Sequence, residues 1–179
     1  PVVVTEYGTF VVPEPTAVPN VPVHVEFFPS TDAVLTEKKA LIDGMRGDGI
    51  AIIDIDSDKT RGVAESLAKN KATFGFDGSA TSRVSTAAVV YSPEGVPTGM
   101  EYEITTDTAT YAVPVVGMVG AHLALSIAAA IAVAEYLNIS KEHIEERLSV
   151  HETPQGRMRL LRGKNNSVLI DDTYNANPG

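Results

Sequence analysis

The sequence predicts an α/β domain with three layers, in which a doubly wound, mostly parallel sheet carries a small antiparallel β excursion. In the first half, apolar runs alternate with helix-like segments in the order βαβαβ, which is typical of a parallel sheet. One run, 50–55, is apolar almost without interruption, as expected for a parallel strand buried on both faces. From 83 to 116, β-branched residues alternate with polar ones between Gly and Pro turns, which predicts an antiparallel meander.

The elements of the first half follow from these patterns in order. The stretch 9–22 contains four prolines and cannot form a helix. Thr31 and Asp32 are good helix-start residues, and Gly47 to Gly49 forms a turn. The predicted elements are strands at 2–5, 23–27, 50–55 and 72–76 and helices at 31–45 and 58–70.

The second half is predicted to change from strands to helices and back to strands. The Ala-rich segment 119–137 predicts a long helix, and Ser140 is a suitable N-cap for the next helix, which runs to residue 150. Two β segments close the chain around a turn at 163–166. The predicted strands are 83–91, 100–106, 110–115, 158–162 and 167–171.

Composition excludes several classes of protein. A net charge of −9 and a pI near 4.8 argue against a nucleic-acid-binding surface, which requires clustered Lys and Arg. There is no cysteine, so disulfides, thiolate zinc sites and cysteine nucleophiles are excluded. The apolar stretch 113–134 contains Pro114, His122 and Ser126 and lacks flanking Lys or Arg, which is untypical of a membrane span. No signal peptide opens the chain, and we expect a cytoplasmic protein.

The first candidate site comprises Glu6, His24 and Lys38. Glu6 and His24 lie near the ends of apolar strands, where open α/β sheets bind ligands, and a carboxylate and an imidazole there could hold a divalent metal. The plainer interpretation is a solvated strand end and an ordinary half-buried histidine. Lys38 stands beside Lys39 in a predicted helix, and two adjacent lysines usually mark a solvated face.

Three further segments contain candidate ligand contacts. In the polar cluster 171–178, Asp172 and Asn175 could contact a nucleotide, although an Asx-type turn explains the pattern equally well. Arg157 follows a Pro-Gln-Gly loop and could contact phosphate or form a structural salt bridge. His122 lies near the start of the long helix, where anions bind, but the neighbouring glycines could serve only the turn.

Taken in order, these segments resemble the Mur ligase family, in particular its branch that adds D-alanyl-D-alanine. The matching segments are 5–8 (TEYG), 23–28 (VHVEFF), 37–42 (EKKALI), 55–58 (IDSD), 120–122 (GAH), 156–158 (GRM) and 171–178 (DDTYNANP). The resemblance implies a P-loop NTPase-like central domain over residues 1–170 and a linker toward a C-terminal domain at 171–179. It also implies ATP-dependent amide formation through an acyl-phosphate, in the synthesis of peptidoglycan precursors.

The resemblance also implies roles for the candidate residues. Glu6 and His24 match magnesium-binding positions, and Lys38 matches a lysine whose carbamate bridges the metal. Arg157, Asp172, His122 and Asn175 match the nucleotide-binding region. The implied cofactors are ATP and Mg²⁺, and the implied partners are a UDP-muramoyl-peptide and D-alanyl-D-alanine, without nucleic acid or membrane.

Two of the chain's departures from the family bear on nucleotide binding. No G-x-x-x-x-G-K-[ST] sequence, the loop that cradles phosphates, occurs in it. Leu123 and Ser126 stand where the family usually has asparagines. We therefore expect this chain alone to be inactive and to bind nucleotide weakly. The alternatives are a non-catalytic binding or scaffold module with the same fold, and a ligase domain of the folylpolyglutamate or cyanophycin type.

Overall fold

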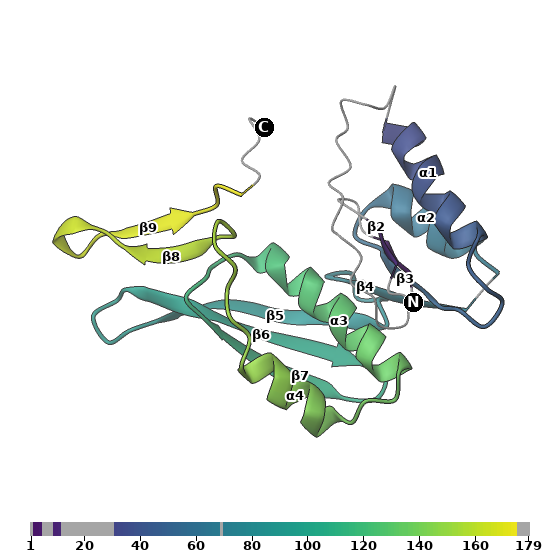
Figure 1. Cartoon of the computed structure of the whole chain (residues 1–179). Helices are drawn as coiled ribbons and strands as arrows, with labels where there is room; N and C mark the ends of the chain where they lie inside the picture. Colours follow the sequence, from purple (N-terminus) through teal and green to yellow (C-terminus); the bar gives the residue numbers. More distant parts are fainter. Residues whose placement is uncertain (1, 5–8, 12–30, 69, 175–179) are drawn as a thin grey trace.

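The computed structural model describes residues 2–4, 9–11, 31–68 and 70–174 (Figure 1). Within them, seven strands form one sheet in the order β2-β1-β3-β4-β5-β6-β7, and a hairpin forms a second sheet. The strands of the large sheet are β1 (Val2–Val4), β2 (Thr9–Val11), β3 (Ala51–Asp54), β4 (Lys71–Gly75), β5 (Ser82–Tyr91), β6 (Pro97–Thr106) and β7 (Thr110–Val116). The hairpin strands are β8 (Arg159–Arg162) and β9 (Val168–Asp171). The helices are α1 (Thr31–Asp43), α2 (Asp58–Ser66), α3 (Ala124–Tyr136) and α4 (Lys141–Ser149), with short 3₁₀ turns η2 (Ala121–Leu123) and η3 (Lys164–Asn166).

The large sheet joins a parallel part to an antiparallel part. The pairs β1/β3, β3/β4 and β4/β5 are parallel. The pairs β1/β2, β5/β6 and β6/β7 are antiparallel. The predicted α/β class and the antiparallel meander are therefore confirmed. The meander does not form a separate sheet, because β5 begins as the parallel neighbour of β4 and then pairs with β6 along most of its length.

Strand β3 shows why the sheet is covered on both faces. All four of its residues are buried, as the uninterrupted apolar run predicts. Ile52 belongs to the core beneath α3, whereas Ala51 and Ile53 belong to the core beneath α1 and α2. Successive side chains of a strand point to opposite faces, so β3 separates two helical layers. In Figure 1, α1 and α2 lie together at the parallel end of the sheet, while α3 runs over the middle of the sheet, on β4 and β5, and α4 lies beside β7.

The carboxylate of Glu135 connects α3 to the turn between β6 and β7 through hydrogen bonds. One oxygen of Glu135, Oε1, accepts hydrogen bonds from the hydroxyls of Thr106 (2.8 Å), Thr108 (2.5 Å) and Tyr111 (2.9 Å). Tyr111 is otherwise buried, and burial, followed by its contact with Glu135, raises its pKa to about 12. The antiparallel part of the sheet is thereby tied to the last turn of α3.

The helix and strand boundaries differ from the predictions at a few points. Helix α2 ends at Ser66, not Asn70, because Leu67 takes an extended conformation. The long helix begins with a 3₁₀ turn and becomes α-helical only at Ala124, and β2 was not predicted as a strand. Ser140 is confirmed as an N-cap, since its hydroxyl accepts from the N–H of His143. The strand predicted at 23–27 lies outside the described residues.

None of the helices in the described ranges is long and apolar enough to cross a membrane. The stretch 113–134, the most apolar of the sequence, is divided between β7, η2 and α3.

Candidate functional site

The structure describes four of the seven candidate residues. Lys38, His122, Arg157 and Asp172 lie within it, whereas Glu6, His24 and Asn175 lie outside the described residues. The proposed convergence of Glu6 and His24 with Lys38 therefore stays a prediction. Within the described ranges no three acidic or histidine side chains cluster as a metal site.

The hairpin β8–β9 is attached to the segment that leads into α3. Met118 forms a bridge with Arg159, the N–H of Val119 donates to the carbonyl of Met158 (3.1 Å), and Leu160 donates to Gly117 (2.8 Å). Figure 1 shows the hairpin beside the start of α3, away from α1 and α2. The loop that carries Arg157 is thus joined to the segment just before His122.

Arg157 and Asp172 are brought together at the open end of this hairpin. The N–H of Met158 donates to Oδ1 of Asp172 (3.3 Å), and the N–H of Tyr174 donates to the carbonyl of Gly156 (3.1 Å). The guanidinium carbon of Arg157 lies 4.2 Å from the centre of the Tyr174 ring, which is a cation–π contact. Among the described residues Arg157 forms no ion pair, so the salt-bridge interpretation finds no support there.

Gly156 cannot be replaced by a larger residue without strain. Its φ of 71° lies in the left-handed region, and a Cβ there would lie 2.9 Å from the backbone nitrogen of Tyr174. The glycine of the Pro-Gln-Gly-Arg loop therefore permits the close approach of the two segments.

Asp171 connects the two segments directly, and it is not among the residues selected from the sequence as candidates. Its Oδ2 accepts from the N–H of Gly156 (3.2 Å), and its Oδ1 accepts from the N–H (3.3 Å) and hydroxyl (2.7 Å) of Thr173. The Thr173 hydroxyl is the main cause that lowers the pKa of Asp171, and the amides of Thr173 and Gly156 and the charge of Arg159 act in the same direction. The Asx-type turn predicted as the alternative for this segment is thus present, at Asp171. The Asp-x-Thr spacing is the signal that could have located it.

His122 is exposed and lies against the backbone of Gly120. A Cβ on Gly120 would approach the His122 ring to 2.9 Å, and Gly120 has a φ of 135°. The carbonyl of Gly120 accepts from the hydroxyl of Tyr102 (2.7 Å), whose pKa burial raises to about 12. The glycine therefore serves the turn, which is one of the two interpretations of this segment, while the His122 side chain is exposed.

Lys38 and Lys39 have opposite environments. Lys38 is 6% exposed and lies on the same face of α1 as Leu35 and Ile42, which pack in the core against β3 and α2. Lys39 points to solvent and pairs with Asp43 at 2.8 Å. The solvated-face interpretation is correct for Lys39 and wrong for Lys38. Because α1 and α3 cover opposite faces of the sheet, the structure does not bring Lys38 next to His122.

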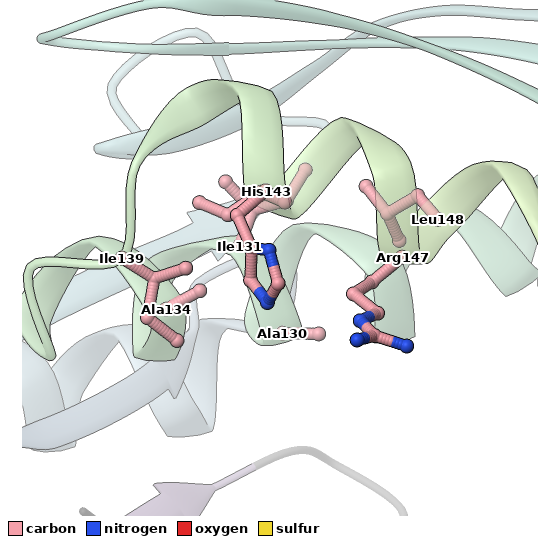
Figure 2. Close-up of a pocket in the computed structure, with 8 residues that line it drawn as sticks. Ala130, Ile131, Ala134, Ile139, His143, Arg147 and Leu148 are labelled. Carbon is pink, nitrogen blue, oxygen red and sulfur yellow. The ribbon is translucent and has the colours of Figure 1, made fainter.

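A shallow hollow of about 240 Å³ lies between α3 and α4, apart from these residues. Figure 2 shows His143 and Arg147 of α4 extending past Ala130 and Ala134 of α3. None of the candidate residues lines it. Because the hollow contains no candidate residue, we take the end of the hairpin as the candidate site. A guanidinium, two carboxylates and an exposed aromatic ring are held together there, and this set of groups suits the phosphate and sugar of a nucleotide.

The sequence model described as "Mur ligase middle domain" matches residues 10–134. Among solved structures, the chain is similar to a MurF ligase from Thermotoga maritima in complex with ADP, with 25% identity and a TM-score of 0.69 over 86% of this chain and 34% of that one. It is similar to MurF from Acinetobacter baumannii, with 22% identity and a TM-score of 0.68 over 86% and 32%. A UDP-N-acetylmuramoyl-L-alanyl-D-glutamate–2,6-diaminopimelate ligase shares 17% identity, with a TM-score of 0.57 over 77% and 28%.

The chain thus spans about a third of the length of each of these structures. Among curated proteins, no sequence matches it.

Proposed function

The chain belongs to the Mur ligase family, of which it contains the middle domain, and from this we propose that it is the nucleotide-handling part of an ATP-dependent carboxylate–amine ligase. The reaction proposed for the whole protein joins D-alanyl-D-alanine to a UDP-muramoyl-peptide in the cytoplasm, where ATP is available. The observation that carries the proposal is the hairpin end, where Arg157 and Asp172 lie together in a chain of this family. The similarity to a MurF ligase in complex with ADP supports the cell-wall branch over the folylpolyglutamate type and over a non-catalytic module.

The groups at the hairpin end fit a nucleotide. The guanidinium carbon of Arg157 lies over the ring of Tyr174, and the guanidinium N–H groups can donate to phosphate. Asp172 is exposed, and Met158 uses only one of its two oxygens, so the carboxylate can also accept from ribose hydroxyls. We include His122 and Asn175 as further contacts on the family resemblance alone.

We propose Glu6, His24 and Lys38 as the residues that hold Mg²⁺. The fit rests on the family resemblance and on the place of Lys38, which is 6% exposed and lies on the face of α1 that packs toward β3. As a carbamate it would become an anionic oxygen ligand, which magnesium prefers. When bound there, Mg-ATP would supply the phosphoryl group that activates the substrate carboxylate, and the metal would neutralise charge on the phosphates.

We further propose that residues 1–170 form the central domain and that 171–179 lead toward a C-terminal domain. The 179 residues contain no Gly-rich Lys loop, so by themselves they should bind nucleotide no better than the order of millimolar and should not form an amide.

The proposal is tested on the protein as its gene encodes it. With ATP, Mg²⁺, a UDP-muramoyl-tripeptide and D-alanyl-D-alanine, we expect release of ADP and phosphate and formation of the amide product, measured by mass spectrometry. Free glutamate in place of the dipeptide should give no product. Absence of the amide product with D-alanyl-D-alanine would refute the proposed reaction.

The adjacent lysines provide a matched pair of variants for the metal proposal. Lys38→Ala should abolish turnover, whereas Lys39→Ala, which removes the same charge from the exposed face, should leave turnover nearly unchanged. Thermal unfolding of both variants must show that they are folded. If Lys38→Ala is folded and active, Lys38 is not part of the metal site.

A further inference from the structure

Asp171 is the only side chain in the described ranges that bonds both segments of the hairpin end through its own two oxygens. Oδ2 accepts from Gly156, in the loop before β8, and Oδ1 accepts from Thr173, in the segment after β9. In the hairpin itself, Asp171 lies directly opposite Arg159. The carboxylate therefore stands where the loop and the outgoing segment must be kept together.

These bonds lie beside the two residues that form the cation–π contact. Arg157 is flanked by Gly156, whose N–H is held by Asp171, and by Met158, whose N–H is held by Asp172. Tyr174 directly follows Thr173, and its own N–H donates to Gly156. The 4.2 Å separation between the guanidinium and the ring thus depends on backbone positions that Asp171 holds.

The hydrogen bonds that both oxygens of Asp171 accept require an ionised carboxylate. An aspartate accepts on both oxygens, whereas the isosteric asparagine accepts on one and presents an NH₂ group on the other side. If that NH₂ faces Gly156, the bond from the N–H of Gly156 is lost. If it faces Thr173, the bond from the N–H of Thr173 is lost and only a donation to the hydroxyl oxygen remains. Hydrogen bonds to a charged group are also roughly twice as strong as neutral ones.

We propose that Asp171 is a positioning residue for nucleotide binding. It holds the loop 154–158 against the segment 171–174, so that Arg157 stays over the ring of Tyr174 and is directed toward the nucleotide. This inference rests on the proposed nucleotide site. Asp171 itself touches no nucleotide and acts only through Arg157 and Tyr174.

The positioning role is tested first without any ligand. The Nε–H of Arg157, near an aromatic ring, should have a ring-current-shifted NMR resonance in the chain. Asp171→Asn should move that resonance toward the position of a solvated arginine. Thr173→Val removes one donor to the same carboxylate and should move the Arg157 resonance less but in the same direction. If Asp171→Asn does not fold, Thr173→Val decides whether Asp171 positions Arg157. An Arg157 resonance unchanged in the folded variants would overturn the proposal.

A second aspartate of the chain is the matched control. Asp77 also accepts from the N–H and hydroxyl of a residue two positions on, Ser79, and pairs with Arg61 at 2.9 Å. Asp77→Asn should lower the thermal midpoint and leave the Arg157 resonance in place. If it moves that resonance as much as Asp171→Asn does, the effect is general destabilisation and the positioning role is wrong.

The link to the ligand is then measured by titrating Mg-ADP into the protein as its gene encodes it and following the same resonance. Asp171→Asn should weaken binding roughly tenfold, as much as Arg157→Ala does, and the double variant should bind no more weakly than Arg157→Ala alone. Additive losses would overturn the proposal. If Mg-ADP does not bind the wild-type chain but Asp171→Asn still displaces the Arg157 resonance, the proposed nucleotide site fails while the positioning of Arg157 stands.

Discussion

Replacing Glu135 should destabilise the fold far more than replacing any other glutamate of the adjoining helices. Three hydroxyls donate to its Oε1, and hydrogen bonds to a charged group contribute about 1.5–3 kcal/mol each. Thr106 and Thr108 can bond to water instead, since they lie at an accessible turn, so their share is small. Tyr111 is 2% exposed and would lose a partner for its hydroxyl. We therefore expect Glu135→Ala to lower the free energy of unfolding by about 2–4 kcal/mol.

The measurement is urea unfolding followed by circular dichroism, in which the midpoint should fall while the slope m stays unchanged. Glu145→Ala is the control, because it also removes one negative charge but breaks only an exposed pair with Lys141, worth less than about 1 kcal/mol. In a double-mutant cycle, Glu135→Ala combined with Tyr111→Phe should cost about 1 kcal/mol less than the sum of the single variants. A cost for Glu135→Ala as small as that of Glu145→Ala, or strict additivity, would refute the reasoning.

Two further predictions concern the hairpin end and the alkaline limit of stability. Gly156→Ala should speed amide exchange at Tyr174 far more than Gly95→Ala does. Both glycines have a positive φ, but only at Gly156 would the new Cβ meet another backbone segment. Equal effects of the two substitutions would show that φ strain alone matters. Burial raises the pKa values of Tyr102 and Tyr111 from 10.0 to about 12, so the folded state keeps their protons to a higher pH than the unfolded state does. The free energy of unfolding therefore falls as the pH rises from 10 to 12. The loss should be roughly 3 kcal/mol per tyrosine at most, and urea midpoints across this range should become flat when both are replaced by phenylalanine.

The order of elements was predictable because it depends on local patterns. The run 50–55 predicted the buried strand β3, the period-two alternation predicted β5 to β7, and Ser140 predicted the start of α4. Each of these signals needs only residues close in the chain, since apolar periodicity and capping are short-range properties. The end of α2 and the start of α3 were predicted less well, because the first and last turns of a helix are weakly specified by local pattern.

The candidate site was predictable in part. Residue type and order selected Arg157 and Asp172, which the fold places together. The environments of Lys38 and Lys39 could not be separated from sequence, because two adjacent lysines have the same local pattern and only the packing of α1 on β3 buries one of them.

Local residue patterns specify the class of fold, the succession of strands and helices, and the family resemblance. The contacts of the carboxylates are a property of the folded chain: Asp171 joins two segments 15 residues apart, and Glu135 accepts from hydroxyls of a turn 24 to 29 residues away. A carboxylate is stabilised by whichever donors the fold brings within about 3 Å of it, and no local pattern specifies those donors.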